Sequence, residues 1–188
     1  SLDEHLITNL LAQGAKVDLF GVGERLITSA SDPVFGGVYK LCAVEENGRI
    51  IPKIKVSENV GKITSPGYKQ VWRLFDKETG KAIADVITLH DEEIDESEPY
   101  ELFDPEFTWK RKVVRNFRAK KLLVRVFDRG RLVYECPDLE SVRKYCREQV
   151  DTLWDEVKRF KNPHGYYVDL SHPLWELREK MIREHSMK

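Results

Sequence analysis

The chain has 188 residues, 41% of them hydrophobic and 34% charged, which suffices for one sizeable core or two small ones. The 31 Lys and Arg nearly balance the 32 Asp and Glu, so the net charge of −1 gives no reason to expect nucleic acid as a partner. No stretch approaches the roughly 20 apolar residues of a membrane span, so we expect no membrane partner.

The start of the sequence, residues 1–5, carries two acidic residues and no basic stretch, so we expect no signal peptide. It lacks a Met and resembles the entry to a helix already in progress, which predicts a fragment of a longer chain. The cysteines, Cys42, Cys136 and Cys146, form no CxxC pair and no Cys/His spacing of a metal site. We therefore expect reduced thiols, a cytoplasmic protein and no metal site.

Residues 1–37 predict the order helix, strand, glycine loop, helix. Asp3 or Ser1 can cap a first helix that ends at Gly14. Alternating polar and apolar residues then predict a short strand over 16–20. One strand cannot bury both of its faces alone, so we expect this segment to be the last βα unit of a larger α/β barrel.

From residue 38 onward the hydrophobic period changes to two, which indicates strands. Turn signals at 46–48, 77–80 and 128–130 predict three hairpins and an antiparallel sheet. The expected strands cover residues 38–44, 50–56, 70–75, 82–89, 122–127 and 132–134.

Two helices are expected to close the chain. An apolar stripe predicts the first of them over residues 139–160. The second should begin near Ser171, with Pro173 in its first turn. The predicted fold class is thus α/β plus α+β, with a hairpin-rich α+β domain over residues 38–188 after the α/β segment of residues 1–37.

The sharpest chemical feature is the loop Gly21-Val22-Gly23, ahead of a short helix expected over 24–29. Two glycines let a ligand approach the backbone closely and leave N–H groups pointing outward. The start of the helix adds unpaired N–H groups and a positive dipole end, so phosphate is the natural ligand. Taken alone, the pattern also fits a tight turn without a ligand.

Further strings accompany this loop along most of the chain. They are Gln13-Gly14-Ala15, Asp18, FGVG at 20–23, Leu26-Ile27-Thr28, Pro33, GGVYKL at 36–41, KIKVS at 53–57, KITSPGYK at 62–69 and VDLS at 168–171. In combination they resemble the nicotinate phosphoribosyltransferase family. The resemblance implies the end of an irregular type II phosphoribosyltransferase α/β barrel followed by the C-terminal domain.

The resemblance also implies an enzyme that joins nicotinate to phosphoribosyl pyrophosphate, giving nicotinate mononucleotide and pyrophosphate in NAD salvage. ATP, hydrolysed through a phosphohistidine, and Mg²⁺ are the implied cofactors, and the full-length chain is implied to form a homodimer. The phosphorylated histidine, the groups that recognise nicotinate and most of the barrel lie upstream in this family. We therefore expect no catalytic residue in this chain and no activity from it alone.

Two parts of the implied site lie in the first unit. Gly21, Val22 and Gly23 match the family loop whose backbone holds the 5′-phosphate of the ribosyl group, and Asp3 matches a segment on the ribose side. Glu24 stands where many relatives have Thr, and a carboxylate repels phosphate. Glu24 should therefore point away, or the backbone alone should make the contact.

Three lysines are candidates for the pyrophosphate side of the site. Lys40, in GGVYKL, corresponds to a lysine that faces pyrophosphate in the related nicotinamide enzymes, and Lys55 and Lys69 are candidates of the same kind. Departure of pyrophosphate leaves an oxocarbenium-like centre, so catalysis depends on positioning and on cations at the leaving group.

Two charged stretches leave other predictions open. Residues 91–106 are acidic, and we expect a solvated loop there, with a Mg²⁺ site as the alternative. Residues 110–131 are basic and predict either a nucleic-acid-binding face or strands whose charges answer the acidic loop. The alternative to the family function is a non-catalytic nucleic-acid-binding or structural interaction domain.

Overall fold

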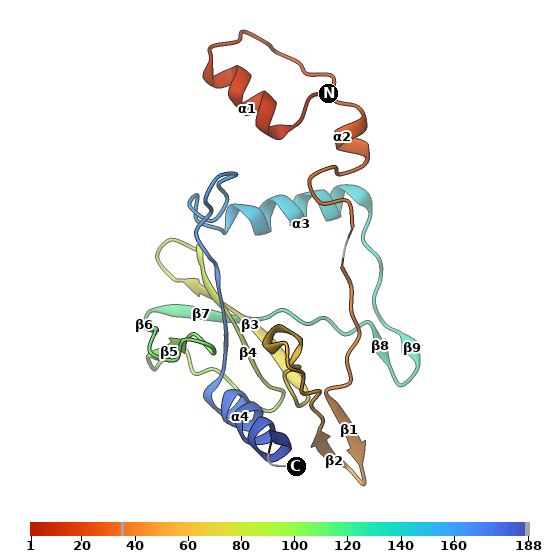
Figure 1. Cartoon of the computed structure of the whole chain (residues 1–188), viewed down its shortest axis with the longest axis vertical. Helices are drawn as coiled ribbons and strands as arrows, with labels where there is room; N and C mark the ends of the chain where they lie inside the picture. The colour runs from red at the N-terminus through yellow and green to blue at the C-terminus, as the bar shows by residue number, and fades with distance from the viewer. Residues whose placement is uncertain (35, 187–188) are drawn as a thin grey trace. The chain divides into compact units, whose positions relative to one another are not determined.

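The computed structural model of the chain describes residues 1–34 and 36–186. It divides into two compact units, Ser1–Tyr39 and Lys40–Lys188 (Figure 1). All of the buried residues among those described belong to the second unit. The described part of the first unit therefore has no buried core of its own.

The first unit contains two helices and their loops. Helix α1 (Glu4–Ala12) begins at the N-cap Asp3, whose Oδ1 accepts a backbone N–H at 2.8 Å, and the chain turns at Gly14 with a φ of +83°. Helix α2 (Glu24–Ile27) is a single turn. The expectation of a strand over 16–20 is wrong, because these residues have no strand beside them among the described residues of this unit. A strand needs a neighbour for its backbone groups, and alternation alone does not form one.

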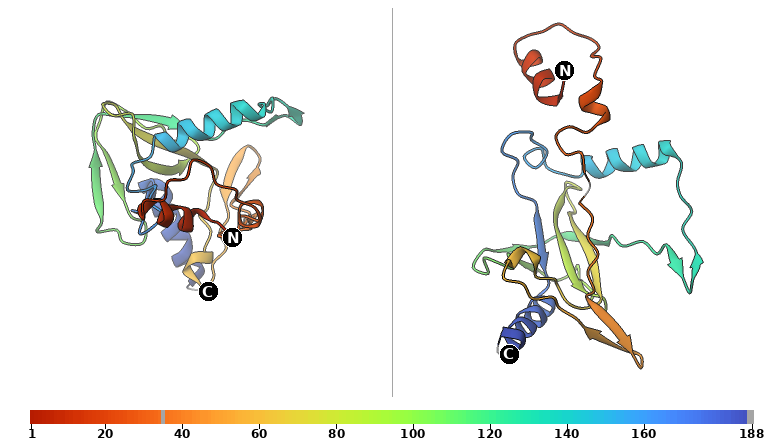
Figure 2. Two further views of the ribbon diagram at one scale, coloured as in Figure 1. Left: turned by 90° about the horizontal axis from the view of Figure 1, so that it is seen from above. Right: turned by 45° about the vertical axis from the view of Figure 1, so that its right-hand side comes forward.

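The second unit is built on a four-stranded sheet in the order β10-β4-β3-β7 (Figures 1 and 2). Strands β3 (Lys69–Asp76) and β4 (Ala82–Leu89) form the predicted hairpin, and β7 (Phe117–Lys121) pairs antiparallel with β3. Strand β10 (Tyr167–Leu170) is parallel to β4, so the expectation of an antiparallel sheet is wrong for this strand. The long connection before β10 makes a parallel return possible.

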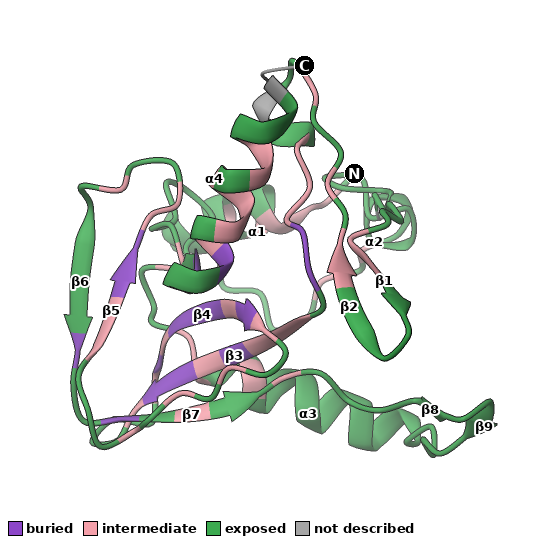
Figure 3. Cartoon of the chain, turned by 90° about the horizontal axis from the view of Figure 1, so that it is seen from below, coloured by how far each residue is buried: buried purple, intermediate pink, exposed green. Residues whose placement is uncertain are grey.

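The core of the second unit lies between this sheet and the hairpin of β5 (Tyr100–Phe103) and β6 (Arg111–Val114). Figure 3 shows the buried positions gathered on β3, β4 and β5. Helix α4 (His172–Ser186) follows β10 directly, contacts β4 and buries Leu174 completely. The buried cluster consists of Leu74, Ala84, Val86, Leu102, Val114 and Phe117.

Two short hairpins are smaller than expected. Strands β1 (Ala43–Glu46) and β2 (Arg49–Pro52) flank Asn47 and Gly48, both with positive φ, while β8 (Phe127–Asp128) and β9 (Arg131–Leu132) flank a similar turn. The turn signals were therefore correct and the strand lengths were not. The remaining short element is the 3-10 turn η1 (Val60–Lys62).

Helix α3 (Leu139–Asp151) ends well before residue 160, which corrects the predicted length. Lys81 Nζ donates to the carbonyl of Asp151 at 2.8 Å, and Ala82 N donates to the carbonyl of Thr152 at 2.8 Å. These hydrogen bonds tie the carbonyls at the helix end to the turn before β4. No described residue of α3 is buried, so its apolar stripe is uncovered.

Candidate functional site

Asp3 holds two parts of the first unit together. Its Oδ1 caps α1 by accepting from Leu6 N at 2.8 Å, and its Oδ2 accepts a hydrogen bond from Arg25 Nη1 on α2. The Leu6 N–H, and after it the Arg25 guanidinium, lower the pKa of the Asp3 carboxyl. Arg25 thus pairs with Asp3. The exposed Glu24 lines one hollow of the first unit together with these two residues.

The glycine loop is open to solvent. Gly21 and Gly23 are exposed, and Val22 is half-buried and lines a pocket of about 260 Å³. A Cβ at either glycine would meet no atom within 4 Å, and neither glycine has a positive φ. The carbonyl of Gly23 accepts from Leu26 N and Ile27 N, both at 3.1 Å, so α2 starts directly on the loop. Neither a close neighbour nor a positive φ therefore requires glycine at these two positions, although Gly23 has a φ of −108° and a ψ of −108°, outside the helix and strand regions.

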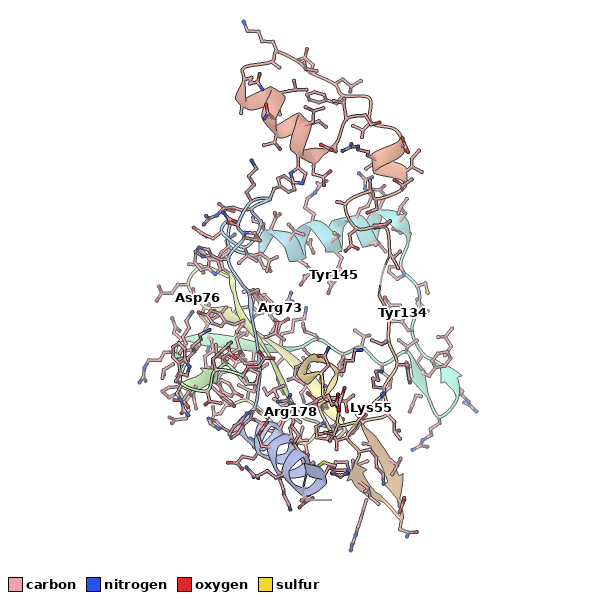
Figure 4. All side chains as sticks on the ribbon, viewed as in Figure 1. Lys55, Arg73, Asp76, Tyr134, Tyr145 and Arg178 are labelled. Carbon is pink, nitrogen blue, oxygen red and sulfur yellow. The ribbon has the colours of Figure 1, made fainter. Side chains whose placement is uncertain are left out.

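The three predicted lysines lie in the second unit and differ in what they do. Lys69 Nζ is half-buried and donates to the carbonyls of Ser65 at 2.8 Å and Gly67 at 2.7 Å, so two of its three N–H groups hold the turn before β3. Lys40 and Lys55 are exposed. Of the three, these two leave their ammonium groups open to a ligand, and Figure 4 labels Lys55.

One backbone carbonyl joins the segments that carry these lysines. The carbonyl of Cys42 accepts from Lys53 N at 2.8 Å and from Gly67 N at 2.7 Å. The first bond continues the β1–β2 register, in which Ala43 faces Pro52. Beyond Pro52 the partner changes: Lys55 N donates to Thr64 Oγ1 at 2.9 Å, and the Lys55 carbonyl accepts from Thr64 N at 3.3 Å.

Residues of the acidic stretch 91–106 form ion pairs with residues of the basic stretch 110–131, as one of the two sequence interpretations proposed. Lys121 Nζ lies 2.5 Å from Glu93 Oε1, and Arg111 Nη1 lies 2.7 Å from Glu101 Oε1. Glu96 accepts a hydrogen bond from Ala119 N at 2.8 Å. Of these two basic residues, Arg111 lies on β6 and Lys121 on β7, and the two strands belong to different sheets. These contacts neutralise part of the basic face that nucleic-acid binding would use.

Sequence reasoning missed a charged cluster inside the main sheet. Arg73 on β3, which is labelled in Figure 4, donates to both oxygens of Asp85 on β4, at 2.8 and 2.9 Å. Tyr166 donates its hydroxyl to Asp85 Oδ1 at 2.9 Å. Burial, and next the charge of Asp85, raise the pKa of Tyr166. Arg73 and Asp85 each stand between apolar residues in the middle of a strand, which is the signal that could have revealed the pair.

A second missed residue is Asp169 on β10. Its side chain is buried, and Oδ2 has no hydrogen-bond partner among the described residues. Burial, and next the charge of Asp104, raise the pKa of Asp169 to about 6. Unpaired buried carboxylates are rare, so this one calls for a partner. The acid within the string VDLS was visible in the sequence, although its burial was not.

Two kinds of feature are not found in the part of the chain that the structure describes. It contains no group of three or more His, Cys, Asp or Glu side chains that could hold a metal. Among its helices, none is long and apolar enough to cross a membrane. The three cysteines are free thiols.

Comparisons with known proteins cover the whole chain. Residues 68–178 match the family described as the nicotinate phosphoribosyltransferase C-terminal domain. The nicotinate phosphoribosyltransferase of Bacillus subtilis (strain 168) is 41% identical over 187 residues, which are 100% of this chain and 38% of that protein. The enzyme of the same name from Dictyostelium discoideum is 33% identical over 183 residues, which are 93% of this chain and 30% of that protein.

A solved structure is similar as well. The crystal structure of human nicotinic acid phosphoribosyltransferase aligns with a TM-score of 0.70 and 25% identity over 97% of this chain and 32% of that chain. The chain therefore spans about a third of the length of the relatives that it matches.

Proposed function

Because the chain belongs to the nicotinate phosphoribosyltransferase family, we propose that it is the C-terminal part of an enzyme that joins nicotinate to phosphoribosyl pyrophosphate. The products would be nicotinate mononucleotide and pyrophosphate, ATP hydrolysis would drive the reaction, and the step would belong to NAD salvage. The family resemblance also supports a cytoplasmic homodimer of the complete chain. This chain alone should be inactive, since it spans about a third of its relatives.

The observation that carries the proposal is the open glycine loop. Gly21 and Gly23 are exposed, and no atom lies within 4 Å of a Cβ placed on either, so a ligand can reach the backbone at both glycines. A phosphate held by the backbone N–H groups would explain them, because a Cβ would stand in its way. The single turn of α2 contributes little dipole, so the loop amides would do the binding.

The leaving pyrophosphate would be met by Lys40 and Lys55. The Cys42 carbonyl joins the segments that carry the two exposed lysines, and like charges on neighbouring segments repel each other. An anion between the two ammonium groups would reverse that effect and would stabilise the charge that develops on the leaving group. Lys69 would act indirectly, by fixing the turn that joins this segment to β3.

Mg²⁺ and ATP would come with the phosphates. The described residues offer no cluster of side chains for a metal, so this chain would not supply a cage of its own. A Mg²⁺ ion commonly keeps several waters and binds through substrate phosphates, which suits that lack. When bound, it would offset the negative charge of the pyrophosphate.

The proposal is tested by synthesis of nicotinate mononucleotide from nicotinate, phosphoribosyl pyrophosphate and ATP. This chain should give no product, and the same chain extended upstream to the length of its relatives should be active. In the extended chain, Gly23→Asp should abolish synthesis, because it places a side chain and a negative charge in the phosphate site. Gly165→Asp is the matched control, since Gly165 is another loop glycine with no atom within 4 Å of a Cβ. Equal activity of both variants would refute the role of the loop.

A further inference from the structure

A pocket of about 390 Å³ lies where the β5–β6 hairpin meets β10 in the second unit. Its volume falls within the roughly 300–1,000 Å³ of small-molecule sites. Residues from both strands of the hairpin, from the turn between them and from β10 form its walls. They are Leu102, Asp104, Trp109, Lys110, Arg111, Lys112, Tyr167 and Asp169, and we refer to it as the β5–β10 pocket.

One wall of the β5–β10 pocket holds an acceptor without a donor. Asp169 is 4% exposed, and its Oδ2 has no hydrogen-bond partner among the described residues. Asp104 cannot satisfy it, because that carboxylate is itself an acceptor, bonded to Glu106 N and Phe107 N at 2.9 Å each. A ligand with an N–H donor would give Asp169 Oδ2 the hydrogen bond that it lacks. An ionised carboxylate only accepts hydrogen bonds, so the site selects for a ligand that donates one.

The rim of the β5–β10 pocket carries two exposed aromatic rings with lysine ammonium groups beside them. Trp109 is 75% exposed, and Tyr167 is 49% exposed. Lys112 Nζ lies over the ring of Tyr167, 5.4 Å from its centroid. Arg111 is engaged with Glu101 and the carbonyl of Thr108. Lys110 Nζ lies 3.9 Å from Asp104 and 5.4 Å from the centroid of Trp109, so one face of that ring remains for a ligand. Lys112 is therefore the cation best placed to meet an anionic group beside an aromatic ring.

We propose that the β5–β10 pocket binds a purine nucleotide that carries an exocyclic amine. The amine donates to Asp169 Oδ2, the base stacks on the exposed rings of Trp109 and Tyr167, and the phosphate contacts Lys112. The three features recognise three parts of one molecule, and neither the proposed phosphoribosyl transfer nor the glycine loop uses any of these residues. The inference therefore stands independently of the proposed function.

Two further observations bear on the size of the ligand. Asp169 Oδ2 is closed off from solvent, so the side chains around it must shift before a ligand can reach it. A longer polynucleotide would need a continuous basic track. Here Lys121 and Arg111 are paired with Glu93 and Glu101, which interrupts such a track.

The test is calorimetric titration of this chain with adenosine 5′-monophosphate, and with purine riboside 5′-monophosphate, which lacks the amine. We expect saturable binding of the first ligand. The second should bind at least about tenfold more weakly, because without the amine it cannot donate the charge-assisted hydrogen bond to Asp169. Lys112→Gln and Trp109→Ala, both at exposed positions, should each weaken binding of adenosine 5′-monophosphate by about tenfold. Lys120→Gln removes an exposed cation of the same basic stretch outside the pocket and should change affinity less than twofold.

Three results would overturn the proposal. The first is no saturable binding to the folded chain. The second is equal affinity for the two nucleotides together with no effect of Lys112→Gln. The third is a single-stranded oligonucleotide that binds far more tightly than the mononucleotide, with a steep salt dependence that Lys120→Gln reduces as much as Lys112→Gln does.

Discussion

Removing the carboxylate of Asp85 should destabilise the second unit by about 3 kcal/mol, because it leaves Arg73 charged and unpaired inside the sheet. Arg73 donates to Asp85 at 2.8 and 2.9 Å, and hydrogen bonds to charged groups contribute about 1.5–3 kcal/mol each. The side chains of Arg73 and Asp85 are 19% and 13% exposed, so water recovers part of that loss. The result lies at the lower end of the roughly 3–5 kcal/mol range for a buried pair broken on one side.

The assay is urea unfolding followed by tryptophan fluorescence, with buried Trp72 on β3 as the native reporter. The variants are Asp85→Ala, Arg73→Met and the double variant, which together form a mutant cycle. Glu148→Ala is the control, because its pair with Lys144 is exposed and should contribute less than about 0.5 kcal/mol. The cycle should give a coupling of about 2 kcal/mol. If Asp85→Ala cost the same with Met at position 73 as with Arg, the reasoning would be refuted.

Three further predictions concern the same unit. Gly67→Ala should cost about 1–3 kcal/mol in urea unfolding, because φ is +93° there and a Cβ would lie 2.9 Å from a leucine methyl; Gly165→Ala, which meets neither obstacle, should be near neutral. The pKa of Asp169 is raised to about 6, so its contribution to stability is present below the unfolded pKa near 4 and is lost as the pH rises through 6. Asp169→Asn should remove that dependence and, above pH 7, raise the free energy of unfolding by about 2–3 kcal/mol; parallel curves for the two proteins would contradict the assignment. Leu74→Ala should cost about 2–5 kcal/mol because Leu74 is fully buried, whereas Leu139→Ala on the uncovered stripe of α3 should cost under about 1 kcal/mol; equal losses would mean that something covers the stripe.

Turn chemistry was the most reliable guide to the second unit. Asn47-Gly48 and the turn that ends at Gly80 have the positive φ values that their sequences predict, and the strands around the second turn extend as expected. Strands β5 and β6 were missed, because the charges of residues 91–112 hide the alternation of the few apolar positions. The parallel pairing of β10 depends on contacts with β4 that are distant in sequence, which local patterns do not record.

The stripe on α3 and the segment at 16–20 failed for a different reason. An apolar pattern states what a segment would bury, but a helix or strand forms fully only where a partner is present. Leu139 is 72% exposed, and the predicted strand has no neighbouring strand among the described residues of the first unit. The candidate phosphate site, in contrast, could be proposed from residue types alone, because Gly21 and Gly23 would act through an absence of side chains, and it stays a prediction.

The central claim is that the loop at 21–23 holds the 5′-phosphate of a nicotinate nucleotide. The most direct test is an amide NMR titration with nicotinate mononucleotide, performed on this chain extended upstream to the length of its relatives. We predict saturable, selective shifts of the Gly21 and Gly23 amides, lost in Gly23→Asp and kept in Gly165→Asp. Saturable binding during which neither glycine amide moves would contradict the account.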